Sequence, residues 1–202
     1  MDWNKIDLIK LLYIEELKIF RLINPRYAKL VYQYAEPFLV EIKTINEGVK
    51  LEKQFKKIKI IFRPNNTIRD TRIKKLKNIT KLNLSRNDKI TDAGIKDMKN
   101  IIVLNLCDNN TITDAGIKDM TNITDLYLPC NNTITDAGIK DMKNITVLNL
   151  YNNNKITDAG IKNMNKTNLN LCYNNTITDA GIKNMNITNL YLNEFSKATR
   201  IK

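Results

Sequence analysis

Carboxylate and amide side chains recur at fixed intervals along this chain, and their types and spacing could do chemistry. Each carboxylate lies in a copy of the phrase Ile-Thr-Asp-Ala-Gly-Ile-Lys, and successive copies are 22, 22, 22 and 21 residues apart. The carboxylates are Asp92, Asp114, Asp136, Asp158 and Asp179. Such a column of aspartates could supply general acids or bases.

A structural role explains the aspartate column better than catalysis does. Each aspartate follows a threonine and precedes a short run with apolar residues at helical spacing, such as Ile95 and Met98. A carboxylate at that place accepts hydrogen bonds from the first free backbone amides of a helix and suits its positive end. We therefore predict that the five aspartates are helix caps.

A second column consists of six asparagines, each three residues past the second apolar residue of a short alternating segment. They are Asn65, Asn87, Asn109, Asn131, Asn153 and Asn174. A side-chain amide can bond the backbone groups that a sharp turn leaves unpaired, in its own repeat and in the next. We interpret the column as a structural ladder rather than a ligand site.

The rest of the sequence excludes most of the common catalytic mechanisms. Its 202 residues include no histidine, which excludes Ser-His-Asp and Cys-His catalysis and every zinc site that contains histidine. It also has no Gly-rich phosphate loop, no metal-ligand cluster and no nucleophile beside a base. We expect a protein that is not an enzyme and that uses no metal or cofactor.

Two further patterns indicate where in the cell the protein is located. No apolar run approaches the roughly 18 residues that a membrane span needs, and the first residues do not form a secretory signal. Asn-x-Thr sequons coincide with the ladder at Asn65, Asn109, Asn131 and Asn174, where a glycan would block burial of the amide. We expect an intracellular protein, in the cytoplasm or the nucleus, without a membrane segment.

Each repeat combines two periodicities. Its first half alternates, as in Leu82-Asn83-Leu84, which predicts a short strand with one buried face. Its second half predicts a helix of one or two turns. Six such copies occupy residues 58–193. Stacked copies predict an α/β solenoid with short parallel strands on its concave face and short helices on its convex face.

This pattern resembles the leucine-rich repeat. One copy reads Leu104-x-Leu106-x-x-Asn109-x-x-Ile112-Thr113-Asp114-x-Gly116-Ile117. It is most similar to the cysteine-containing subclass of F-box/leucine-rich-repeat proteins, although asparagine holds the cysteine position and the usual repeat is longer, about 26 residues. The 22-residue period is also similar to that of internalin-type adhesion repeats. The resemblance implies a solenoid that binds protein partners.

The positions that flank the buried leucines vary from copy to copy and point to the concave face. Aromatic residues with a polar tip are common anchors of protein interfaces, which favours the tyrosines among these positions. We predict that a protein partner binds Asp125, Tyr127, Asn149, Tyr151, Asn170 and Tyr191.

The regions outside the repeats are expected to be an α-helical N-terminal cap over residues 1–49, a basic connector over 50–57 and a tail over 194–202. Within the first region, IEELKIFRLINPRYAKL, from Ile14 to Leu30, resembles the latter part of an F-box, a helical module that binds a Skp-type adaptor in a ubiquitin ligase. Two readings stay open: these helices only cap the solenoid, or they also bind the adaptor.

The charge adds a competing hypothesis. The chain has a formal net charge of +12, and residues 50–80 hold eleven basic and two acidic side chains, or +9. A basic stretch over residues 50–77 could bind nucleic acid or another anionic surface. The sequence therefore favours a protein-binding scaffold, such as a substrate-recruiting F-box adaptor, over a nucleic-acid-binding module.

Overall fold

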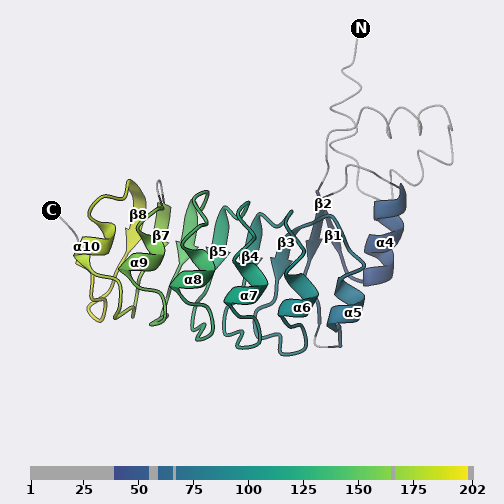
Figure 1. Ribbon diagram of the computed structural model, residues 1–202, viewed down its shortest axis with the longest axis horizontal. Coiled ribbons are helices and arrows are strands. Elements are labelled where there is room, and N and C mark those ends of the chain that lie inside the picture. The colour runs from purple at the N-terminus through teal and green to yellow at the C-terminus, as the bar shows by residue number, and fades with distance from the viewer. Residues whose placement is uncertain (1–38, 55–58, 66, 165–166, 200–202) are drawn as a thin grey trace, which may run out of the picture.

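The computed structural model describes residues 39–54, 59–65, 67–164 and 167–199. In this part of the chain, eight strands form one parallel sheet in the order of the sequence. The helices lie in a row on one side of the sheet, so the molecule is an elongated array of stacked coils (Figure 1). The expected α/β solenoid of short strands and short helices is confirmed.

The elements follow the 22-residue period. The strands are β1 (Leu39–Ile42), β2 (Lys59–Phe62), β3 (Ile79–Asn83), β4 (Val103–Asn105), β5 (Asp125–Tyr127), β6 (Val147–Asn149), β7 (Thr167–Asn170) and β8 (Ile187–Tyr191). The helices are α4 (Ile45–Gln54), α5 (Asp70–Ile73), α6 (Asp92–Ile95), α7 (Asp114–Ile117), α8 (Asp136–Ile139), α9 (Asp158–Ile161) and α10 (Asp179–Ile182). We call one strand with its following turn and helix a coil.

The core is one continuous apolar column between the strands and the helices. The coil that begins with β4 contributes Leu104 from the strand and Leu106 just after it, Ile112 from the turn, and Ile117 from α7 with Met120 just beyond it, all fully buried. Equivalent residues of the neighbouring coils pack against them. Because one coil has no second layer to cover its apolar side, each coil is stable only when stacked.

Five asparagines form the predicted ladder inside the turns. Asn109 donates from Nδ2 to the carbonyl oxygens of Leu84, at 2.9 Å, and Asn87, at 2.7 Å, both in the preceding coil. Its Oδ1 accepts from the backbone N–H groups of Thr111 and Ile112 in its own turn. Asn131, Asn153 and Asn174 are also buried and also join their own turn to the preceding coil.

Asn65 does not belong to this ladder, so that part of the prediction is corrected. Its side chain is exposed, and its Oδ1 accepts only from Thr67 in the same turn. In the later coils, the residue before the ladder asparagine has a positive φ, as at Arg86 (54°). The equivalent residue here is Pro64, whose ring fixes φ near −65°. The first turn therefore takes another path, and within the described residues Asn87 Nδ2 is left without a partner.

The aspartate column has a different role from the predicted one. The N-cap of each helix from α6 to α10 is the preceding threonine, and Thr113 Oγ1 accepts from the Ala115 N–H at 3.3 Å. Asp92 instead accepts from the N–H of Thr113, at 2.8 Å, and from its Oγ1, at 2.6 Å, across the boundary to the next coil. The same pair of bonds is made by Asp114, Asp136, Asp158 and Asp179.

The glycine of the repeated phrase makes room for this aspartate. A Cβ atom at Gly116 would meet the carboxylate of Asp92, with Asp92 Cγ at 3.1 Å. A real Cβ rarely approaches so closely, so a larger residue would push the two coils apart. Asp92, Thr113 and Gly116 thus form one clamp between coils, which recurs along the helical side of the array.

The array begins earlier than predicted. Residues 39–42 form a strand that pairs in parallel with β2, and residues 45–54 form a helix, so part of the expected cap and connector is an atypical first coil. Glu52 Oε1 on α4 accepts from the backbone N–H groups of Lys77, at 2.7 Å, and Asn78, at 2.6 Å. This first coil lacks the repeat phrase, and the longer helix α4 takes the place of the turn and the one-turn helix of the later coils. The helices expected within residues 1–38 lie outside the described residues.

The array also extends further along the chain than predicted. Residues 194–199, expected as a tail, form the turn that follows β8. Ser196 Oγ donates to the Leu171 carbonyl oxygen at 2.8 Å, and Ala198 is buried. The Thr199 N–H and Oγ1 donate to Asp179 at 2.6 and 2.7 Å, which repeats the clamp of the inner coils.

We predict that Asn131→Ala lowers the free energy of unfolding by about 2 to 5 kcal/mol, because it leaves buried carbonyl and amide groups of two turns without partners. Urea denaturation followed by circular dichroism measures the change. Asn132→Ala is the matched control, since Asn132 is exposed and bonds only within its own turn. Equal losses in the two variants would contradict the ladder.

The last clamp predicts a pH response at the C-terminal turn. Hydrogen bonds from the backbone and then the side chain of Thr199 hold the pKa of Asp179 below its ordinary value. A carboxyl group with a lowered folded-state pKa stabilises the fold above its unfolded pKa, and this contribution is lost as the pH falls through the folded value. We expect the Thr199 amide resonance to shift at that lowered pH. Titration at or above the ordinary value would show that the bonds do not form in solution.

Candidate binding surface

The strand register places the variable residues in two rows on the face of the sheet opposite the core. One row consists of Asn83, Asn105, Tyr127, Asn149, Asn170 and Tyr191, which are neighbours across successive strands. The other consists of Lys81, Val103, Asp125, Val147, Asn168 and Asn189. Neighbouring strands of a sheet lie roughly 4.8 Å apart, so the rows form a continuous surface. Five of the six residues predicted to bind a partner lie in these rows, and Tyr151 lies beyond them.

The asparagines of the first row hold their own turns as well as facing the surface. Asn149 Oδ1 accepts from the Tyr151 N–H at 3.0 Å, and Asn170 Oδ1 accepts from the Cys172 N–H at 3.0 Å. Within the described part of the chain, the Nδ2 groups of these two asparagines have no protein acceptor. Each amide therefore fixes the backbone of its own turn with its oxygen.

Tyr127 and Asp125 form the middle of the surface. Tyr127 is half-buried, and burial together with the negative charge of Asp125 raises the pKa of its phenol. Asp125 Oδ2 accepts from Thr124 Oγ1 at 2.6 Å, which holds the carboxylate on the sheet. At neutral pH this pair presents one phenol O–H donor next to one carboxylate acceptor.

An aromatic stack, made of Tyr151, Tyr173 and Phe195, lies in the turns next to the rows. The ring centroids of Tyr151 and Tyr173 are 5.3 Å apart in an edge arrangement, and those of Tyr173 and Phe195 are 5.2 Å apart in a parallel one. The three side chains are 39%, 41% and 56% exposed. Three large exposed rings in contact form an apolar patch of the kind that marks an interaction site.

Two residues of the stack occupy places that the repeat would fill differently. Tyr173 has a φ of 59°, a conformation that strains a bulky side chain. Phe195 stands one period after Asn174, at the ladder position itself. The ladder bond to Leu171 is made by Ser196 instead, so Phe195 is free to lie on the surface.

Sequence reasoning missed Tyr173 and Phe195. It considered only the positions that flank the leucine pairs, whereas these residues lie two and three positions beyond the second leucine. The stack is diagonal, because Tyr151, Tyr173 and Phe195 come from successive places in successive turns. An aromatic residue in a column otherwise filled by Arg86, Asp108, Cys130 and Asn152 was the available signal.

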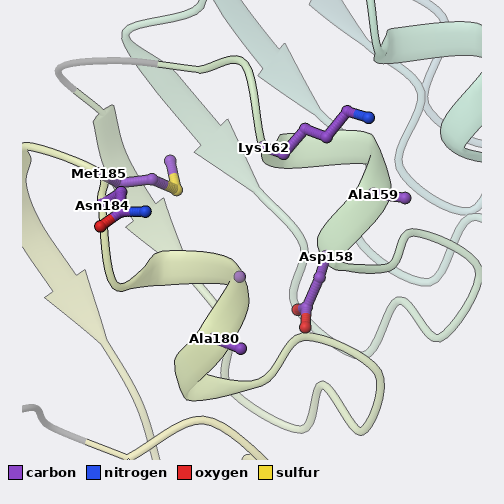
Figure 2. Close-up of a pocket in the computed structure, with 7 residues that line it drawn as sticks. Asp158, Ala159, Lys162, Ala180, Asn184 and Met185 are labelled. Carbon is purple, nitrogen blue, oxygen red and sulfur yellow. The ribbon is translucent and has the colours of Figure 1, made fainter.

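A shallow depression of about 280 Å³ lies on the helical side, between α9 and α10. Figure 2 shows Asp158 and Lys162 projecting from opposite ends of α9. Between α8 and α9, Asn163 Nδ2 donates to the Lys140 carbonyl at 3.3 Å. Between α9 and α10, the equivalent Asn184 makes no such bond in the described residues. The depression therefore marks a place where two neighbouring coils are joined by fewer hydrogen bonds, and we assign no binding site to it.

The basic residues of α4 and of the segment around α5 lie apart from this surface. Among those the structure describes, Lys50 and Lys53 are exposed on α4, and Arg72, Lys74 and Lys75 are exposed on or just after α5. Lys56 and Lys57 lie outside the described residues. This end of the array therefore carries a second kind of surface, rich in positive charge.

The described ranges contain no helix that is long and apolar enough to cross a membrane. In the same part of the chain, no group of three or more cysteine, aspartate or glutamate side chains is arranged to hold a metal ion.

Comparison with known proteins agrees with the repeat geometry. A family model described as Leucine Rich repeat matches residues 75–99 and 141–164. The first match spans β3 and α6, and the second spans β6 and α9, so each covers a strand, a turn and a helix. No curated protein sequence matches the chain.

The Tyr127 environment predicts a titration. Because burial and the Asp125 charge both favour the neutral phenol, Asp125→Asn is expected to move the pKa of Tyr127 back toward its ordinary value. The change is followed by measuring phenolate absorbance against pH. The Tyr127→Phe variant serves as the blank, because its difference from the native chain is the titration of Tyr127. An unchanged titration in the Asp125→Asn variant would place the carboxylate away from the phenol.

Proposed function

We propose that this leucine-rich repeat protein is a scaffold that binds a protein partner on the sheet face of its array, with the aromatic stack as the anchor. The observation that carries the proposal is the exposed contact between Tyr151, Tyr173 and Phe195 in an otherwise repetitive structure. Large aromatic residues supply much of the energy of protein interfaces, because they bury a wide area with few rotatable bonds.

The neighbouring rows supply the polar part of the interface. Asn149 and Asn170 offer free Nδ2 donors, Tyr191 is 53% exposed, and Asp125 offers a carboxylate near the Tyr127 phenol. Few of these side chains are charged, so little desolvation of ions opposes binding. The role is binding, and we assign no catalytic residue, metal or cofactor.

The more specific role that we propose is recruitment of a substrate to a ubiquitin ligase. It is supported by the resemblance of the Ile-Thr-Asp-x-Gly repeat to F-box/leucine-rich-repeat proteins and by the F-box-like stretch from Ile14 to Leu30. That stretch precedes β1, which starts the array at Leu39. Adaptor binding and substrate binding would therefore use separate parts of the chain.

An intracellular location fits this role. Three of the sequon asparagines, Asn109, Asn131 and Asn174, are buried and bond the turns of two coils. A glycan at any of them would prevent the ladder from forming, so these positions suit a compartment without N-glycosylation.

A second candidate function rests on the exposed basic side chains of α4 and of the segment around α5. Lys50, Lys53, Arg72, Lys74 and Lys75 would attract a nucleic acid or another anionic surface. This candidate uses the opposite end of the array from the aromatic stack, so the two can be tested independently.

The test is affinity capture from a cell extract with the full chain and with the double variant Tyr151→Ser/Phe195→Ser. Both side chains are exposed, so the fold is expected to persist, and recovery of the specific partners is expected to fall about 10-fold or more. Lys155→Ser is the control, because it removes an exposed side chain from the turn between the two tyrosines without touching the stack.

Three outcomes separate the alternatives. Undiminished recovery with the double variant would contradict binding through the stack. Recovery that falls steeply with salt and with Lys74→Ser/Lys75→Ser would favour the anionic partner. Absence of a Skp-type adaptor among the captured proteins would reject the ligase role and leave the scaffold.

A further inference from the structure

We propose that Cys107 and Cys130 form a reversible disulfide site, which closes in the presence of an oxidised low-molecular-weight disulfide such as oxidised glutathione. The two cysteines belong to the coils that begin with β4 and β5, which are neighbours in the middle of the array (Figure 1). Both thiols are free and half-buried. The closed bond joins the two coils whose strands carry Asn105 and Tyr127, and it does not depend on which partner the sheet face binds.

Two positions in each turn define the geometry of the site. The first turn position follows the second leucine of the coil, and the second turn position comes one residue later. The first positions are Ser85, Cys107, Pro129, Tyr151 and Cys172, and the second positions are Arg86, Asp108, Cys130, Asn152 and Tyr173. The residues at the second position all have a positive φ, from 49° to 59°. The turns therefore follow the same path, so a contact that one pair of coils makes is open to another pair.

A backbone hydrogen bond holds Cys107 close to Cys130. The Asp108 N–H donates to the Pro129 carbonyl at 2.9 Å, as in a pair of parallel strands. The donating peptide group begins at Cys107, and the accepting one ends at Cys130. With coils roughly 4.8 Å apart and about 3.3 Å between successive residues, the two Cα atoms are about 6 Å apart. A disulfide joins Cα atoms that are roughly 4.4 to 6.8 Å apart, so this spacing permits one.

Two tyrosines show that side chains at these positions meet. Tyr151 holds the first turn position of one coil and Tyr173 the second turn position of the next, which is the relation between Cys107 and Cys130. The ring centroids of the two tyrosines are 5.3 Å apart. Because the turns share one path, the two cysteine side chains leave the backbone in the same directions as these tyrosines.

The disulfide replaces one weak contact of Cys130. Asn152 Nδ2, in the next coil, donates to Cys130 Sγ at 3.6 Å. A thiol sulfur is a weak acceptor, and Asn152 is exposed, so water can take over its amide. Rotation about the Cα–Cβ bond of Cys130 then turns its sulfur from Asn152 toward Cys107, and the backbone stays in place.

The reaction consists of two thiol–disulfide exchanges. The thiolate of one cysteine attacks a sulfur of oxidised glutathione, whose S–S bond breaks, and one glutathione thiolate leaves. The thiolate of the other cysteine then attacks the cysteine sulfur of the mixed disulfide and releases the second glutathione. The protein loses two electrons and two protons, and the two glutathione thiols gain them. In an intracellular protein the thiols are reduced at rest, so the site closes only when the glutathione pool is oxidised.

The test is peptide mapping of the full chain after incubation with oxidised glutathione. Remaining thiols are blocked with N-ethylmaleimide, and trypsin then separates the three cysteines into peptides 100–118, 119–140 and 167–183. Mass spectrometry is expected to find the first two peptides joined, and to find them separate after reduction. Cys172 is the internal control, because it is also free and half-buried and holds the same turn position as Cys107. We expect no peptide joined to 167–183.

A matched variant moves one thiol by a single coil. Cys130→Ser/Asn152→Cys, made together with Cys172→Ser, places the thiol at the same turn position one coil further from Cys107. The added spacing of roughly 4.8 Å puts the Cα atoms beyond the roughly 7 Å limit for a disulfide. Linkage is expected to fall about 10-fold or more relative to Cys172→Ser alone, because the two thiols are no longer held at a high effective concentration.

Three results would overturn the proposal. One is equal linkage in the two variants, which would show that the thiols meet without the geometry of neighbouring turns. Another is glutathione attached to Cys107 and Cys130 with no bond between them. The third is a linkage found only in a species of twice the chain mass of 23.4 kDa on a non-reducing gel, because the bond would then join two chains.

Discussion

Everything in this molecule depends on satisfying the backbone groups that its turns bury. Each coil turns sharply from the sheet into the core, and the turn places N–H and C=O groups where water cannot reach them. The ladder asparagines supply what the backbone lacks, with Oδ1 accepting from two amides of the same turn and Nδ2 donating to carbonyls of the coil before. Because the amides of Asn109, Asn131, Asn153 and Asn174 each join two coils, the same bonds fix the shape of one turn and its spacing from the coil before.

A second set of contacts fixes the coils on the opposite face. The carboxylate of each aspartate in the repeated phrase takes two hydrogen bonds from the threonine of the following coil, and a glycine provides the space it needs. The ladder and the clamp lie at different places around each coil, so together they prevent both sliding and rotation between neighbours. The side chains on the sheet face take part in neither the ladder nor the clamp between coils. Their residue types can therefore differ from copy to copy.

The two ends show what happens when the repeat is interrupted. Pro64 cannot take the turn conformation of the later coils, so Asn65 leaves the ladder. The atypical first coil bonds the next one differently, because Glu52 on α4 accepts from the backbone N–H groups of Lys77 and Asn78. At the other end, Ser196 replaces the ladder asparagine and releases Phe195 to the surface. The same change completes the aromatic stack, because Phe195 lies on Tyr173.

The sequence by itself determined the period, the strands, the short helices and the ladder, because these depend on spacing that neighbouring copies repeat. It also identified Tyr127, Tyr151 and Tyr191 as surface residues from the alternation about each leucine pair. Only the tertiary structure showed that Asp92 and its equivalents bond the next coil rather than their own helix, since both roles require the same residue before the same helix. It alone brought Tyr173 and Phe195 onto Tyr151, because contacts between residues 22 apart depend on how the turns stack and not on the pattern within one turn.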